Sequence, residues 1–148
     1  MSINRAAIFD ALVARLGTVP GVQSVRTRLI PFENVTPKEQ PALFVFPTEQ
    51  SDVNAAPGMP PVWSLSYSLL VLVHDDSAAG PQRALQAVLD GIEAALVALP
   101  DEVQFPQARH HTTLGGLVRQ VAITGLTTRG EVSGPQTIAN IELEVVAA

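Results

Sequence analysis

The sequence contains no cysteine, so disulfide bonds and thiolate metal sites are excluded outright. Cations are also sparse, because Lys38 is the single lysine and the eight arginines are scattered along the chain. A nucleic-acid-binding domain gathers Lys and Arg on one face, where they displace phosphate counterions. The scattered cations and a net charge of −5 therefore argue against nucleic-acid binding.

Long apolar runs are missing as well. No stretch reaches the roughly 20 apolar residues of a membrane span, so we expect no membrane partner. Asp10 and Arg15 interrupt the apolar run near the amino terminus, which argues against a signal peptide of the usual kind. A chain of 148 residues with 47% hydrophobic content can bury a core of its own, so we predict a single domain over residues 1–148.

Recognisable chemistry is scarce too. His74, Asp75 and Asp76 are adjacent, so their side chains point in different directions, and acids before a helix are explained by capping and by the helix dipole. Neighbouring histidines such as His110 and His111 rarely chelate one ion together. No nucleophile motif or phosphate-binding glycine pattern accompanies them. We therefore expect no enzyme activity, no cofactor and no metal site.

The longest regular pattern lies in the segment 60–77, PPVWSLSYSLLVLVHDDS, which predicts a strand about twice the usual length. One face is apolar throughout and consists of Trp63, Leu65, Tyr67, Leu69, Val71 and Val73. The other face is polar in its first half, with Ser64, Ser66 and Ser68, and apolar in its second. We interpret residues 69–73 as covered by a helix and residues 63–68 as projecting toward another subunit.

The segments before this strand have weaker patterns. Residues 3–16 have helical spacing, with Ser2 as the expected N-cap and Gly17 as the residue after the helix. Residues 22–30 predict an edge strand, and residues 42–46 predict a short strand buried on both faces. Residues 48–60 have no apolar period, so we interpret them either as an assembly loop or as plain surface loop.

After the long strand, residues 81–99 have the apolar spacing of a helix, for which Asp75, Asp76 and Ser77 offer caps. Residues 117–128 and 136–146 alternate around a turn-rich heptapeptide, which predicts a long antiparallel hairpin. The strand at 117–128 can neighbour the long strand in a parallel or an antiparallel sense, because the connection length allows both.

This order of elements predicts an α+β fold. We expect a two-layer domain in which two main helices pack on one face of a mixed, mainly antiparallel sheet of about five strands, including the long C-terminal hairpin.

The same layout resembles the tail terminator, or tail completion, proteins of long-tailed bacteriophages, including the lambdoid type. The features that carry the resemblance are the opening helix through Leu16, the strand PALFVF with its polar loop, the long strand from Trp63, the helix at 81–99 and the closing hairpin. The resemblance covers nearly the whole chain. It is one of layout, so no signature residue is carried over.

The resemblance implies a non-enzymatic ring, usually a hexamer, at the head-proximal end of the phage tail in the virion, assembled in the host cytoplasm. Its implied partners are copies of itself, the tail tube protein and a neck or head-completion protein. Such a ring stops tube polymerisation and offers a surface to the neck. DNA passes through its lumen only as cargo, and an acidic chain suits that passage.

A ring requires two different patches on each subunit that meet head to tail. The long strand, the 48–60 loop and the hairpin tip are the places where we expect them. Trp63 and Tyr67 are interpreted as core or interface anchors. The predicted interface residues are Trp63, Tyr67, Asp52, Met59, Arg129 and Glu131.

Two other functions stay open from the sequence. One is a related tail or neck component, such as a tube-forming or head–tail joining protein. The other is a small-molecule-binding domain or enzyme, because a fold does not fix a function. Rings in solution or on tail tubes favour the terminator, whereas a monomer with a deep pocket and convergent polar groups favours the last alternative.

Overall fold

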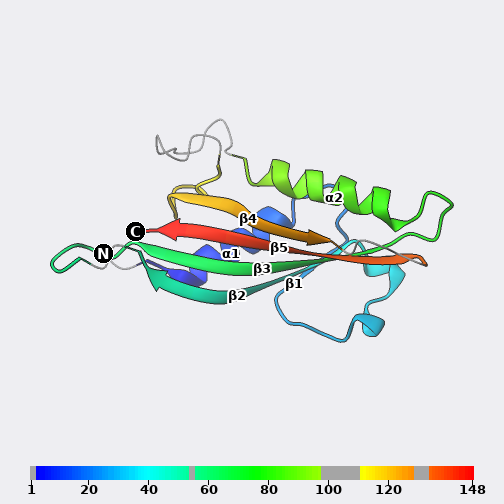
Figure 1. Cartoon of the computed structure of the whole chain (residues 1–148), viewed down its shortest axis with the longest axis horizontal. Coiled ribbons are helices and arrows are strands. Elements are labelled where there is room, and N and C mark those ends of the chain that lie inside the picture. The colour runs from blue at the N-terminus through cyan, green and yellow to red at the C-terminus, as the bar shows by residue number, and fades with distance from the viewer. Residues whose placement is uncertain (1–2, 54–55, 98–110, 129–133) are drawn as a thin grey trace.

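The computed structural model describes residues 3–53, 56–97, 111–128 and 134–148. Five strands form one sheet in the order β1-β2-β3-β5-β4, and α1 and α2 pack against one of its faces (Figure 1). The parallel β1–β2 pair makes the sheet mixed, while the other pairs are antiparallel. The fold class expected from the sequence is confirmed.

Strand β3, Trp63–His74, is the centre of the sheet. Its residues 63–72 pair with β2, Ala42–Asp52, on one side, and its whole length pairs with β5, Gln136–Ala147, on the other. The long strand is therefore confirmed. The expectation that residues 63–68 project is wrong, because Trp63 is paired with Asp52 on one side and with Ala147 on the other.

Residues 63–68 do not project because β2 is longer than predicted. The predicted strand ended at residue 46, whereas β2 continues to Asp52. Pro47 lies inside the strand, where the pairing with β3 shifts register between Pro47 and Glu49. Proline is tolerated in an edge strand or at a bulge, since no ladder hydrogen bond from its nitrogen is required there. The long loop at 48–60 is thus reduced to a connection that Val53 N–H closes by donating to the Val62 carbonyl.

The two outer strands also differ from expectation. Strand β1 is limited to Ser24–Arg26 and pairs with residues 42–44 of β2. Strand β4, Gln120–Thr128, forms the predicted hairpin with β5, which separates it from β3. Neither of the two ways in which β3 and β4 could be neighbours is therefore realised.

The helices begin and end where local chemistry allows. Helix α1, Arg5–Leu16, is capped by the side chain of Asn4, which accepts a hydrogen bond from Ala7 N–H; Ser2 lies outside the described residues. Gly17 ends the helix in a right-handed conformation with φ −66° and not in a left-handed turn. The prediction of Ser2 as the N-cap is therefore wrong, because the helix begins at Arg5 and Asn4 occupies the cap.

Helix α2, Pro81–Ala95, starts at a proline, which suits a first turn because its missing N–H needs no partner there. Its N-cap is Gly80, whose φ of 76° favours glycine, so Asp75, Asp76 and Ser77 do not cap it. The helix was predicted to reach residue 99, but it ends at Ala95, with Leu96 as the C-cap.

The main core lies between the helices and one face of the sheet. Leu12 and Leu16 of α1, Leu85 and Ile92 of α2, and Leu69 of β3 are all at most 1% exposed. The opposite face has a smaller core under residues 27–41, which include the short 3-10 turns Phe32–Asn34 and Pro37–Glu39. That smaller core consists of Val35, Ala42, Phe44 and Leu72.

A buried leucine of the central strand should dominate stability. We expect Leu69→Ala, at a fully buried position, to lower the free energy of unfolding by about 2–5 kcal/mol through lost burial and an unfilled cavity. The matched control is Leu117→Ala, which we expect to cost less than about 1 kcal/mol because Leu117 is 44% exposed. Urea unfolding checks both values, and equal losses would contradict the assigned core.

Candidate assembly surfaces

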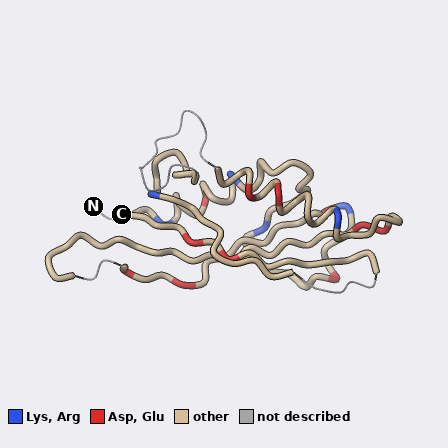
Figure 2. The backbone as a smooth tube through the Cα atoms, turned by 45° about the horizontal axis from the view of Figure 1, so that its top comes forward, with Lys and Arg blue, Asp and Glu red and all other residues tan. Residues whose placement is uncertain are grey.

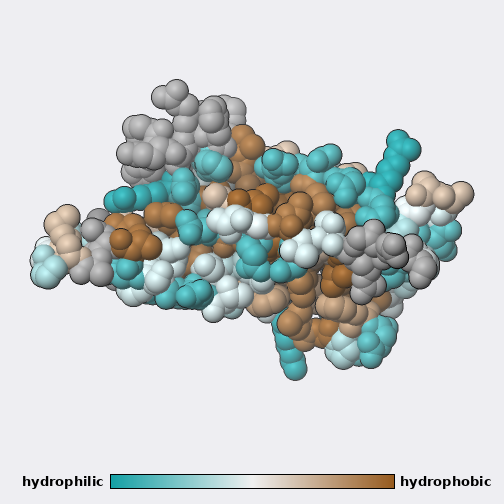
Figure 3. All heavy atoms as spheres, in the orientation of Figure 1, coloured by the Kyte–Doolittle hydropathy of each residue, from teal (hydrophilic) through white to brown (hydrophobic). Residues whose placement is uncertain are grey.

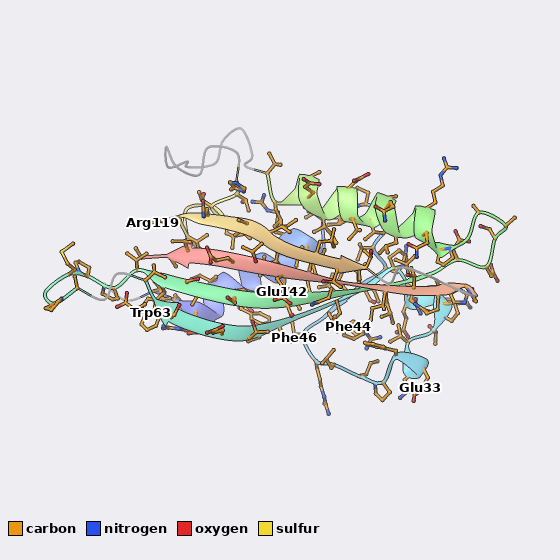
Figure 4. All side chains as sticks on the ribbon, in the orientation of Figure 1. Glu33, Phe44, Phe46, Trp63, Arg119 and Glu142 are labelled. Carbon is orange, nitrogen blue, oxygen red and sulfur yellow. The ribbon has the colours of Figure 1, made fainter. Side chains whose placement is uncertain are left out.

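Two of the predicted interface residues meet at one end of the sheet. Trp63, which Figure 4 labels at this end of the sheet, is paired with Asp52 of β2. The Arg5 guanidinium lies 4.7 Å from the centroid of the Trp63 ring. Arg5 Nε also donates to Gln50 Oε1 at 2.6 Å, while Asp52 Oδ1 accepts from Val62 N–H at 3.2 Å. The half-buried Trp63 is therefore held by α1 and is only partly available to a partner.

Tyr67 belongs to the core of its own chain. Its side chain is 2% exposed and packs edge-on against Phe9, with ring centroids 5.9 Å apart. Of the two alternatives given for this residue, core anchor or interface anchor, the structure supports the first. Burial raises the pKa of Tyr67 above its ordinary value, and the Arg5 charge opposes that rise.

The remaining predicted residues lie at chain connections. Met59 is 56% exposed and Val53 is 60% exposed in the connection between β2 and β3, which extends beyond the end of the sheet (Figure 1). Arg129 and Glu131 lie outside the described residues. An apolar tip is thus present at the loop that the sequence had singled out.

A shallow apolar groove between α2 and β4 was not predicted. Two hollows of about 300 and 260 Å³ adjoin there and share Glu93 and Ile123 in their walls. The exposed apolar side chains of this groove are Val97 at 47%, Ile123 at 38% and Leu126 at 53%. A register shift between Ile123 and Gly125 sets Ile123 and Leu126 on the same face, although simple alternation would separate them.

The second face of the sheet brings glutamates of β2 and β5 together around β3. Ser66 of β3 lies between Glu49 of β2 and Glu144 of β5, and directly paired residues share a face. One pleat along, Glu142 Oε1 accepts from Ser68 Oγ at 3.0 Å and from Asn140 Nδ2 at 2.8 Å. Figure 2 shows acidic positions on both β2 and β5.

This acidic surface is the part of the second face that residues 27–41 leave uncovered. Figure 1 views it with α1 behind the sheet, and Figure 3 shows mostly hydrophilic side chains over its middle strands. Among the described residues, its charged side chains are Glu49, Glu142 and Glu144. The arrangement repels a polyanion and offers it no cation to bind.

Two of the residues that the sequence analysis considered for catalysis or metal binding, Asp75 and His111, can be placed in the described part of the chain. Asp75 Oδ1 accepts from Ser77 N–H at 2.8 Å, and its hydrogen bonds with Ser77 hold the pKa of Asp75 below its usual value. His111 lines the α2–β4 groove, and His110 lies outside the described residues. No cluster of three metal-ligating side chains occurs in the described ranges, and no helix in them is long and apolar enough to span a membrane.

Comparisons with known proteins give structural likenesses but no family. No family model matches the chain, and no curated protein matches it. A chain from a solved structure titled "Virion of native gene transfer agent (GTA) particle" is 11% identical, with a TM-score of 0.46, over 95% of this chain and 91% of that one. A likeness at this identity and TM-score assigns no function to the chain.

Tyr67 is the chain's single tyrosine, so tyrosinate absorbance reports its ionisation alone. We expect a titration midpoint above the ordinary value of 10.0, because burial disfavours the phenolate. Arg5→Ala should raise the midpoint further, since the Arg5 charge favours the phenolate. The folded state then holds the proton more tightly than the unfolded state, so stability should fall as pH rises above the unfolded value, and Tyr67→Phe should remove that fall. A midpoint at or below 10.0 in the folded protein would contradict the burial of Tyr67.

Proposed function

We propose that this chain is a non-enzymatic structural protein of a bacteriophage virion. In this role it forms a ring, a hexamer by analogy with the family it resembles, at the head-proximal end of the tail tube. The ring stops tube polymerisation and offers the surface to which the neck or head is joined. It needs no metal and no cofactor, and it meets DNA only as cargo that passes through the lumen.

The observation that carries this proposal is the uncovered acidic face of the sheet. A domain that needed this face for its own stability would cover it, yet Glu49, Ser66 and Glu144 form a polar row across three strands. A lumen wall must let the DNA backbone slide without sticking. Glutamates with no cation beside them in the described part of this face meet that requirement, because like charges keep the phosphates at a distance.

The separation of the exposed apolar surfaces also supports a ring. The exposed Val53 and Met59 belong to the connection beyond one end of the sheet, whereas Ile123 and Leu126 lie beside α2. Two unlike surfaces at separate places allow one surface of a copy to contact the other surface of the next copy, which is the arrangement of head-to-tail contacts. A tube-forming or head–tail joining protein would share this property, and the position of the chain in the tail distinguishes these functions.

Phage particles assembled without this chain test the function. In electron micrographs we expect tails of irregular, excessive length and unattached heads, because nothing ends tube growth or joins the neck. Adding the purified chain before the tubes elongate should restore uniform, joined tails. Tails of normal length that lack only heads would favour a joining protein, and the absence of any tube would favour a tube protein.

The acidic face makes a separate prediction about DNA. Glu49→Lys combined with Glu144→Lys adds cations on one row of the uncovered face, and we expect it to create salt-dependent binding to double-stranded DNA. The exposed Asp10 on α1 gives the control, since Asp10→Lys changes the charge on the helical side. In assembled particles the double variant should slow DNA ejection, whereas the control should not. Ejection unchanged by the double variant would show that this face does not line the lumen.

A further inference from the structure

We propose that neighbouring copies of this chain meet through two unlike patches, one on each edge of the sheet. The α2–β4 groove of one copy receives the segment 27–41 of the next copy. The ring in which this contact repeats rests on the proposed function, but the contact itself can be tested separately.

The groove is apolar and has an acidic rim. Ile123 and Leu126 contribute its exposed apolar surface from β4, and Val97 follows α2. Glu93 lines both hollows, and Asp90 lies one turn earlier on the same helix, with both side chains exposed. A partner for this groove should therefore combine exposed apolar side chains with positive charge.

The segment 27–41 has that combination. Leu29 is 50% exposed and Phe32 is 42% exposed, and Phe32 is supported from beneath by Phe44 with ring centroids 6.1 Å apart. Figure 3 shows hydrophobic side chains gathered over this segment at the lower right. Both apolar side chains are large, and Phe32 is held against Phe44, as interface anchors are held by packing.

The charge of the segment is opposite to that of the groove. Arg28 and Lys38 are exposed there, and Glu33 is the exposed acid of the segment. The segment's other acid, Glu39, forms an ion pair with Arg26 of β1, so those two charges offset each other. The chain has a net charge of −5, so a surface that combines exposed apolar side chains with a net positive charge differs from the rest of the molecule.

Geometry makes the contact intermolecular. Residues 27–41 connect β1 to β2 at one edge of the sheet, while the groove borders β4 at the opposite edge. They also lie on opposite faces, because the segment covers Phe44 and Leu72 while the groove adjoins the helices. Two unlike patches on opposite sides of a subunit are what a head-to-tail contact requires.

Engineered cysteines test the contact directly, because the natural chain has none. Leu29→Cys and Ile123→Cys replace exposed side chains, so both variants should fold, which circular dichroism checks. We expect an equimolar mixture of the two variants to form a disulfide-linked heterodimer under mild oxidation. A chain that has both cysteines should give a ladder of higher multimers. Each single variant alone should stay unlinked.

Charge reversal supplies a second readout. Glu93→Arg or Lys38→Glu alone should weaken association by about tenfold or more in sedimentation experiments, through like-charge repulsion. An equimolar mixture of the two variants should recover association, because each variant keeps one native patch and the altered patches now attract. Asp10→Arg on α1 is the matched control and should leave association unchanged.

The outcomes separate the contact from the function. The contact is overturned if Leu29→Cys links to itself, if the mixture gives no cross-link, or if rings survive both charge reversals. Rings that survive both reversals leave the proposed ring function intact and assign the groove to another occupant, such as the tube. Cross-links and reversal effects as expected, in a chain whose removal leaves tails normal, uphold the contact and refute the proposed function.

Discussion

The structure depends on the pairing of β3 along both of its sides. Residues 63–72 pair with β2 and residues 63–74 pair with β5, which fixes the register of both neighbours. That register turns Leu65, Tyr67 and Leu69 toward the helices and the alternating serines toward the opposite face. A slip by one residue would exchange these two sets, so the apolar row of β3 specifies the entire sheet.

The two faces of this sheet are covered to different extents, and this difference determines which surfaces are open to a partner. The helices cover most of one face and leave the groove beside β4, whereas residues 27–41 cover part of the other face and leave an acidic remainder. The coverage also creates the two unlike edge patches, because α2 borders β4 and the 27–41 segment borders β1. A subunit with one open face and two unlike edges suits a closed ring around a channel.

The sequence predicted the features that depend on local periodicity: the long strand, the helices, the hairpin and the two-layer class. The sequence did not predict the features that depend on contacts between residues far apart in the chain. Pro47 usually ends a strand, but β3 pairs with the residues on both sides of it. Tyr67 and Trp63 share one alternating row, yet α1 buries Tyr67 and leaves Trp63 partly exposed. The groove beside α2 depends on a register shift near Gly125, which alternation in sequence does not reveal.

The measurement that tests the central claim most directly is an electron cryomicroscopy map of the junction between the tail and the head of the assembled particle. The account predicts a closed ring of this chain on the last layer of the tube, with Glu49, Glu142 and Glu144 facing the lumen. A ring whose lumen is lined by the helices or mainly by arginine would contradict the account, as would this chain being absent from the junction.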